Sequence, residues 1–317
     1  MVNYLMQFMD GSRINVLAAL VSFGLTFLMI ELFRNKLPQD HGRQFAVNGA
    51  LSKGKARGAG LLFVLCMALC ALAFTPFSVE LAIYMLLLVA SMLSGYLDDA
   101  ADTPWNEYKK GLIDFIIAIV AGTTYLYFNG TSVHFLAWTF ELPYMVYLVL
   151  AIILIWVAIN VVNCTDGVDG LSGVMSMITM GTFLMAFHEE LGSFATVVVV
   201  VMASVAAYLW RNASPSSVMM GDAGSRALGF FVAVLSMKSG HPFAFVLAAL
   251  VFILDGGLGI LKISLKRFLK IWILKDIRTP LHDHARKNCG WSDAQVVIRF
   301  ALLQMLVSAV LLLMTGC

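Results

Sequence analysis

The chain has 317 residues, of which 60% are hydrophobic and 13% are charged, and its mean hydropathy is +0.87. A soluble domain has about 25% charged residues, so this composition excludes a soluble protein and indicates one that crosses a membrane several times. The formal net charge of +2 says little by itself, and no nucleic-acid partner is expected.

Ten apolar runs follow one another along the chain, each close to the ~20 residues that a helix needs to cross a bilayer. They lack the alternating pattern of a membrane β-barrel. We therefore predict an all-α polytopic membrane protein with about ten transmembrane helices, forming a single integral membrane domain over residues 1–317. The ninth run contains Asp255 and three glycines in "DGGLG", which predicts a bent or broken helix. The runs span residues 13–33, 57–75, 79–97, 110–128, 143–163, 169–187, 192–210, 222–238, 242–265 and 295–314.

Basic residues concentrate in the segments that follow the odd-numbered runs. The segments after the second, fourth and sixth runs contain no lysine or arginine, and the segment after the eighth contains only Lys238. Since basic loops stay in the cytoplasm, we predict that these segments are cytoplasmic and that both termini lie outside. The basic residues are Arg34, Lys36, Arg43, Lys53, Lys55, Arg57, Lys109, Lys110, Arg211, Arg226, Lys262, Lys266, Arg267, Lys270, Lys275, Arg278, Arg286 and Lys287.

Two adjacent aspartates, Asp98 and Asp99 in "SGYLDDA", end the third run on the predicted cytoplasmic side. Consecutive side chains on a helix point about 100° apart, so the two carboxylates are expected to do different jobs. A solvated helix end is the alternative, but carboxylates oppose the dipole at a helix C-terminus. Acidic side chains at membrane depth are functional by default, and we therefore interpret the pair as functional.

The stretch "NVVNCTDGVDGLSG", residues 160–173, is polar although apolar runs flank it. Asn160, Asn163 and Asp166 recur every three residues and would form one polar edge of a helix. The glycines that follow let the backbone turn, and irregular backbone at this depth is tolerated where it lines a watery cavity. The alternative is a capped turn with Asp169 as N-cap of the next helix, but it leaves the other three side chains unexplained.

The segment "MMGDAGSRALG" places Asp222 between two glycines at the start of the eighth run. Exposed backbone N–H groups at a helix N-terminus suit a phosphate. Asp222 is equally suited to be an ordinary N-cap, and on this segment alone both interpretations stay open.

The segment "RTPLHDHARKNCGWSD" places His282 and His284 two residues apart in a basic loop. As zinc ligands they lack a third partner nearby. They are better interpreted as donors to a phosphate, with a plain surface loop as the alternative. Just before this segment, residues 261–275 alternate lysine and apolar residues, which predicts an amphipathic helix at the anionic inner leaflet.

Together these clusters predict a phosphate site that depends on magnesium. Carboxylates are hard oxygen ligands suited to Mg²⁺, and such an ion bridges a diphosphate and holds it for in-line attack. A site built on membrane helices and open to the cytoplasm suits transfer from a water-soluble nucleotide donor to a lipid acceptor. The acidic residues are Asp98, Asp99, Asp166, Asp169 and Asp222; Lys110, His282 and His284 offer positive charge or donors.

The same clusters, in this order, resemble the polyprenyl-phosphate N-acetylhexosamine-1-phosphate transferase superfamily. Its members carry a DD pair, an N-x-x-N-x-x-D-G-x-D-G-like segment and a G-D-x-G-S segment, which here are "YLDDA", "NVVNCTDGVDGL" and "MGDAGSRALG". The tail "TPLHDHARKNCGWSDAQVVIRF" is most similar to the bacterial phospho-N-acetylmuramoyl-pentapeptide transferase branch. The resemblance covers nearly the whole chain, and the joint set of motifs is highly specific.

The resemblance implies a reaction in peptidoglycan synthesis at the bacterial cytoplasmic (inner) membrane. Undecaprenyl phosphate attacks the β-phosphate of UDP-MurNAc-pentapeptide, UMP leaves and lipid I forms, with Mg²⁺ as cofactor. The active site would face the cytoplasm among membrane lipids, and a homodimer is expected from the family alone.

The resemblance also implies roles for individual residues. Asp98 is the candidate base or nucleophile, and Asp99 is its partner. Asp222 is the expected Mg²⁺ ligand, with Asp99 as a second. Lys110 matches the lysine that opens the fourth helix, and His282 and His284 match the outer members of a triple histidine. The residues expected to line the nucleotide pocket are Asn163, Asp166, Gly167, Asp169, Asn212 and Met219.

The sequence departs from the family pattern at several places. The middle histidine is Asp283, the aromatic residue that would stack on uracil is Met219, and a glutamate expected in the ninth run is Asp255. Residues 54–60 replace the usual threonine-proline motif, and Arg226 stands where leucine is common. These changes leave the catalytic aspartates untouched but bear on the choice of donor.

Two other functions compete. A sister transferase that uses UDP-GlcNAc or a related UDP-sugar shares the aspartate motifs, although the "GWSDAQVVIRF" ending favours the muramoyl-pentapeptide branch. An ion-coupled transporter also carries carboxylates within the membrane. Transporter sites lie near the bilayer midplane, whereas the aspartates here cluster at the cytoplasmic ends of the runs.

Overall fold

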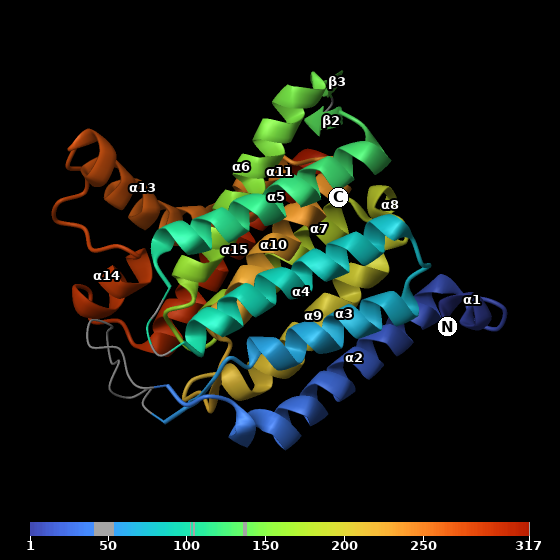
Figure 1. Ribbon diagram of the computed structural model, residues 1–317, viewed down its shortest axis with the longest axis horizontal. Helices are drawn as coiled ribbons and strands as arrows, with labels where there is room; N and C mark the ends of the chain where they lie inside the picture. The colour runs from blue at the N-terminus through green and yellow to red at the C-terminus, as the bar shows by residue number, and fades with distance from the viewer. Residues whose placement is uncertain (41–53, 102, 104, 136–137, 317) are drawn as a thin grey trace.

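The computed structural model describes residues 1–40, 54–101, 103, 105–135 and 138–316, and these are mostly helical (Figure 1). Arg43 and Lys53 lie outside the described residues. Nine long helices match nine of the apolar runs: α2 (Gly11–Phe33), α3 (Gly60–Phe74), α4 (Val79–Asp99), α5 (Glu107–Asn129), α6 (Tyr144–Thr165), α7 (Leu171–Ala186), α9 (Phe194–Asn212), α10 (Gly221–Lys238) and α15 (Asp293–Thr315). Shorter helices are α1 (Val2–Leu5), α8 (His188–Leu191), α14 (Leu281–Lys287) and a 3-10 turn at Arg34–Lys36.

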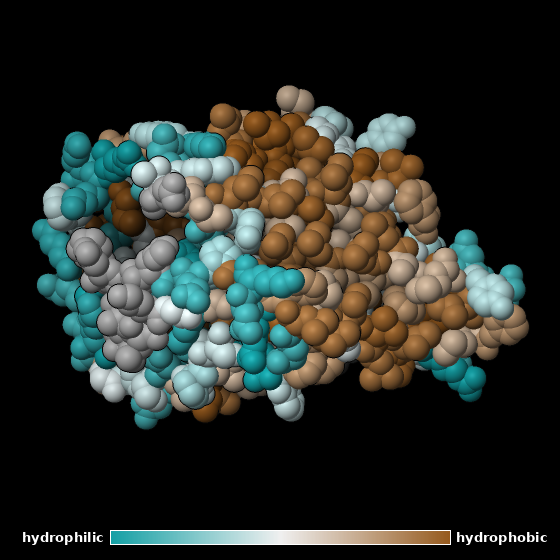
Figure 2. Space-filling model, turned by 60° about the horizontal axis from the view of Figure 1, so that its bottom comes forward, coloured by the Kyte–Doolittle hydropathy of each residue, from teal (hydrophilic) through white to brown (hydrophobic). Residues whose placement is uncertain are grey.

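Six of the described helices are long and apolar enough to cross a membrane, which confirms an all-α polytopic membrane protein. Two shorter apolar helices, α3 and α7, accompany them. In Figure 2 a broad apolar surface extends along the bundle, while hydrophilic side chains gather at the end near α13 and α14. The six spans are Gly11–Lys36, Val79–Asp99, Glu107–Asn129, Tyr144–Thr165, Phe194–Asn212 and Asp293–Thr315.

The ninth run is interrupted, but its break lies before the glycines, whose own stretch continues as a π-helical turn. It is divided into α11 (Ala244–Ala248), α12 (Leu250–Phe252), a π-helical turn (Ile253–Gly257), α13 (Leu258–Ser264) and a second π-helical turn (Leu265–Leu269). Ala249, at φ −120° and ψ 20°, leaves the helical conformation between the first two pieces. The expected helix over residues 261–275 is wrong in its second half, because Lys270 adopts a left-handed conformation and residues 270–275 are not helical.

Helix α10 forms the centre of the bundle and packs against α3, α4, α6 and α7. Every one of its residues is buried except Asp222 near its first turn and Lys238 at its last residue. Close packing requires a glycine on α4, because a side chain at Gly95 would collide with the backbone of Asp222. The contact between α4 and α10 therefore fixes where the acidic ends of both helices meet.

Short-range signals fix where the helices that carry the site begin. Asn106 caps α5 by accepting the backbone N–H of Lys109 at 2.8 Å, which places Lys110 in the first turns of that helix. Ser292 and Gln295 form a capping box at the start of α15.

Four short strands lie among the described residues. Strand β1 (Ala56–Arg57) pairs in parallel with β4 (Val218–Met219), and β2 (Ser132–Phe135) pairs antiparallel with β3 (Trp138–Glu141). The first pair lies near the end of the bundle that carries the acidic residues, and its register sets Arg57 opposite Met219.

Candidate active site

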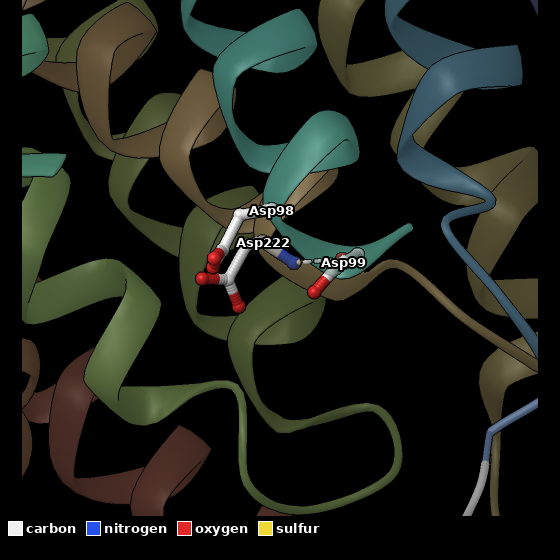
Figure 3. Close-up of side chains that lie close together, drawn as sticks. All are labelled: Asp98, Asp99 and Asp222. Atoms are coloured by element: carbon white, nitrogen blue, oxygen red, sulfur yellow. Dashed lines mark hydrogen bonds between the residues drawn. The ribbon is translucent and has the colours of Figure 1, made fainter. Parts of the chain in front are cut away.

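Three carboxylates from two helices meet at the hydrophilic end of the bundle. Asp98 and Asp99 end α4, Asp222 lies in the first turn of α10, and one oxygen from each falls within 4.8 Å of the others. Figure 3 shows Asp98 and Asp222 facing one another, while Asp99 is joined to the backbone of Asp222. That bond, from the Asp222 N–H to Asp99 Oδ2, measures 2.8 Å.

The adjacent aspartates make different contacts, as their angular separation predicted. Asp98 is buried, accepts the backbone N–H of Trp105 at 2.7 Å and forms an ion pair with Lys110. Asp99 instead accepts hydrogen bonds from the Arg57 guanidinium group and from the backbone N–H of Asp222. Lys110 Nζ also lies 3.6 Å from Asp222 Oδ2, so this lysine connects the two carboxylates that face one another.

Arg57 is a member of the site that the sequence interpretation missed. Its Nη2 lies 2.6 Å from Asp99 Oδ1 and 3.9 Å from Asp222 Oδ1, and its Nη1 lies 3.4 Å from Asp40 Oδ1. Pairing of β1 with β4 holds it there. In the sequence, the basic segment that contains Arg57 indicates which side of the membrane it faces. A basic residue beside glycines also indicates a phosphate contact, and this second signal could have identified Arg57.

Asp169 is held by basic and backbone donors and does not cap a helix. It accepts Lys55 Nζ at 3.0 Å and the backbone N–H of Ser216 at 3.1 Å. The N-cap of α7 is Gly170, which has no side-chain cap. The alternative interpretation of Asp169 as an N-cap is therefore wrong, and Lys55 is a second contact that the sequence interpretation did not include.

Asn212 lies behind the loop rather than on its surface. Its side chain is buried, accepts the backbone N–H of Gly170 at 2.8 Å and donates to the carbonyl of Val218 at 2.9 Å. The amide thus ties the loop before α7 to strand β4. Both ends of this amide are engaged inside the protein, which gives Asn212 a supporting position, and its contact with a nucleotide stays a prediction.

The expected polar edge of α6 divides into separate contacts. Asn160 donates to the carbonyl of Trp156 at 2.8 Å, and Asn163 donates to Ser225 Oγ on α10 at 2.9 Å. Asp166 is the C-cap residue of α6 and is partly exposed. Met219, on β4, is also partly exposed. Asn163 therefore links α6 to α10 one turn beyond Asp222.

His282 is fixed by Asp255, the aspartate of the interrupted ninth run. Both are buried, and Asp255 accepts the backbone N–H of His282 at 2.7 Å and lies 2.8 Å from its Nδ1. The opposite ring nitrogen, Nε2, is directed at Gly167, where a side chain would collide with the imidazole. Glycine at this position thus lets the histidine approach the loop that carries Asp166 and Asp169.

The charge of Asp283 is compensated by its neighbours. Its carboxylate lies 3.8 Å from Arg278 Nε and 3.8 Å from Arg286 Nη1. His284, on the same short helix α14, accepts the backbone N–H of Arg278 at Nδ1 at 3.2 Å. The departure from histidine therefore adds an acidic side chain that two arginines flank.

The donor set fits a magnesium ion. Carboxylate oxygens are the ligands that Mg²⁺ prefers, and Asp98, Asp99 and Asp222 bring three together. Of the five aspartates expected to offer ligands, the described residues place these three in one cluster, while Asp169 is engaged by Lys55. Lys110 and Arg57 add positive charge at the rim, which suits a site for a polyanion as well as a metal.

Comparisons with known proteins agree with the motifs. Residues 81–240 match the glycosyl transferase family 4. The chain is 38% identical to the phospho-N-acetylmuramoyl-pentapeptide-transferase of Treponema pallidum (strain Nichols), covering 93% of this chain and 88% of that protein. Proteins of the same name from Helicobacter pylori (strain Shi470) and Bartonella quintana (strain Toulouse) are 32% and 29% identical over 39% and 38% of this chain, and over 34% and 33% of their own lengths.

The match to the family covers α4 to α10 and so includes all three clustered carboxylates. The longer match to the Treponema protein extends over most of the chain. The chain therefore belongs to the glycosyl transferase family 4 and, within it, to the phospho-N-acetylmuramoyl-pentapeptide transferases.

Proposed function

We propose that the chain transfers phospho-MurNAc-pentapeptide from UDP-MurNAc-pentapeptide to undecaprenyl phosphate, which gives lipid I and UMP in peptidoglycan synthesis. The observation that carries the proposal is the cluster of Asp98, Asp99 and Asp222 at the hydrophilic end of a membrane-embedded bundle. Identity to a phospho-N-acetylmuramoyl-pentapeptide-transferase over 93% of the chain supports the choice of reaction.

In the proposed reaction an oxygen of the lipid phosphate forms a bond to the β-phosphorus of the donor. The bond from that phosphorus to the oxygen bridging to the α-phosphorus breaks, and UMP leaves with that oxygen. Asp98 takes the proton that the attacking phosphate carries. Its burial and its contacts with Lys110 and the Trp105 N–H hold the carboxylate in one orientation, as a positioned base requires.

The basic residues around the cluster stabilise the charge of the diphosphate. Lys110 and Arg57 reach the carboxylates from α5 and β1, and preorganised cations of this kind are worth more in a site shielded from water. Bound Mg²⁺, held by Asp99 and Asp222, would neutralise the diphosphate and act as a Lewis acid. His282, fixed by Asp255 through Nδ1, would present Nε2 toward a phosphate or ribose beside Gly167.

The proposal includes an arrangement in the membrane. Helices lie on all ten apolar runs, one of them interrupted, and this supports ten crossings of the bacterial cytoplasmic membrane. The N-terminus and the end of α15 lie at the end of the bundle away from α14 (Figure 1), which supports outer termini and a site that faces the cytoplasm. Labelling of single cysteines in intact cells, placed after α8 and in α14, tests this sidedness.

Substrate choice is tested with purified protein, undecaprenyl phosphate and Mg²⁺. We expect lipid I to form from UDP-MurNAc-pentapeptide and no lipid product from UDP-GlcNAc. The opposite preference would move the protein to the sister transferases, which Met219 and Asp283 leave as the competing choice. A homodimer, expected from the family, is tested separately by cross-linking in membranes.

A further inference from the structure

An ion pair lies within the membrane-spanning part of the bundle, below the carboxylate cluster. Arg226 on α10 pairs with Asp114 on α5, and their exposed fractions are 4% and 1%. Asn160 on α6 interacts with the same carboxylate. The transfer reaction proposed above uses none of these three side chains.

The pair lies one helical turn below two residues of the site. Lys110 and Asp114 are four residues apart on α5, and Asp222 and Arg226 are four residues apart on α10. Side chains at this spacing lie on the same face of a helix. The two helices are therefore joined by two successive contacts, Lys110 with Asp222 at 3.6 Å and Arg226 with Asp114 below it. The sign of the charge alternates along each helix.

The deeper pair occupies a place where the helices have little other contact. Helix α5 packs mainly on α4 and α6, and its packing against α10 is slight. Direct side-chain packing between the two helices therefore contributes little to how α5 is rotated and shifted against α10. A charge at membrane depth is costly unless it is paired, so Arg226 and Asp114 strongly favour the one arrangement in which they meet.

We propose that the Arg226–Asp114 pair positions Lys110 against Asp98 and Asp222. It does so by fixing the register of α5 on α10, so that the ammonium group lies between the two carboxylates that face one another. Arg226 and Asp114 are positioning residues that do not touch substrate. The inference rests on the proposed function where it concerns turnover, and on the geometry alone where it concerns the cluster.

The test replaces both charges with apolar side chains in the double variant Asp114→Leu/Arg226→Leu. A buried ion pair replaced by apolar residues is often neutral for stability, whereas removal of one partner leaves a buried charge. We expect the double variant to have a melting temperature near that of the wild type and a KM for the nucleotide donor within ~3-fold of the wild-type value. We expect its kcat for UMP release to be lower by at least ~10-fold, because small misplacements of catalytic groups have effects of this size. A purely structural pair would leave kcat unchanged, and kcat within ~2-fold of the wild type overturns the proposal.

A matched control is available at the other end of the same helix. Lys238 of α10 pairs with Glu80 of α4 at 3.0 Å, far from the cluster. The variant Glu80→Gln/Lys238→Met removes this ion pair, and we expect kcat within ~2-fold of the wild type because the pair has no role in placing Lys110. An equal loss of kcat in this control would show that any ion pair on α10 matters and would overturn a specific role for Arg226.

Two further measurements keep the test decisive. If the double variant does not fold, Arg226→Lys keeps the charge but loses the planar fork; we expect it to fold with an intermediate kcat, and a wild-type kcat overturns the proposal.

Binding of Mn²⁺ without substrates, followed by electron paramagnetic resonance, reports on the cluster itself. A loosened Lys110 should change Mn²⁺ affinity at least ~3-fold, and an unchanged affinity contradicts the inference. Lack of any turnover by the wild type would instead count against the proposed function.

Discussion

Arg57 Nη2 lies 2.6 Å from Asp99 Oδ1, although 42 residues of sequence separate the two side chains. The contact brings a guanidinium group into the carboxylate cluster, and the same group is 3.9 Å from Asp222. Arginine recognises phosphate through two parallel hydrogen bonds. We therefore expect the Arg57 guanidinium to leave the Asp99 carboxylate and bind a phosphate of the donor instead.

Arg57→Ala is expected to lower kcat/KM by about 10²-fold, because a preorganised donor to the diphosphate is lost. Arg57→Lys should recover part of this loss, since an ammonium keeps the charge but not the fork. Steady-state UMP release checks both variants. Lys36→Ala is the matched control, because Lys36 is a basic residue of the same segment whose ammonium lies over the Phe33 ring. Equal effects at both positions would argue against a specific role for Arg57.

Asp98→Asn and Asp222→Asn are each expected to lower kcat by ~10²–10⁴-fold, the usual range for loss of a positioned acid–base group. Each change keeps the shape of the side chain and removes its charge. Thermal unfolding in detergent should show folded protein in both cases. Asp276→Asn alters an exposed aspartate and should keep full activity. Near-normal turnover in either cluster variant would refute the role assigned to that residue.

Asp255→Ala is expected to reduce turnover by acting on His282. The change removes the acceptor for two donors of a buried histidine, and an unsatisfied buried donor costs about 1–3 kcal/mol. The imidazole then loses its fixed orientation beside Gly167. Kinetics of Asp255→Ala, His282→Ala and the double variant check the dependence. The double variant should be no worse than His282→Ala, whereas additive losses would show independent roles.

Gly167→Ala is expected to lower activity by displacing the His282 ring, because a Cβ at this position would overlap Nε2. Gly24→Ala on α2 is a suitable control, since nothing lies within 4 Å of the added carbon. UMP release and the melting temperature should be measured for both. Unchanged kinetics in Gly167→Ala would mean that the loop and the histidine do not act together.

The acidic part of the site could be predicted from the sequence because each aspartate lies at the end of an apolar run. Acidic side chains at such positions are visible locally and are costly without a function. Arg57 and Lys55 could not be found this way, because β1 pairs with β4 across more than half of the chain and two-residue strands leave no periodic pattern. The same limit applies to Asn212, whose two amide contacts depend on how the loop before α7 folds back on β4.

The helices themselves were largely predictable, since apolar runs of this length have few other structures available in a membrane. An irregular ninth run was expected from its glycines and Asp255, which form a π-helical turn, but the break itself lies at Ala249, which no local pattern marks. The extent of the lysine-rich helix after it could not be predicted, because Lys270 and Leu274 adopt left-handed conformations that nothing in the local pattern indicates.

Chelation of divalent metal ions is the most direct test of a magnesium site at the carboxylate cluster. UMP release from UDP-MurNAc-pentapeptide and undecaprenyl phosphate should be measured in purified protein after treatment with EDTA and again after Mg²⁺ is restored. We expect turnover to be lost and then recovered, with the recovery absent in Asp222→Asn. Full turnover in EDTA, with the protein still folded, would contradict a magnesium site at Asp98, Asp99 and Asp222.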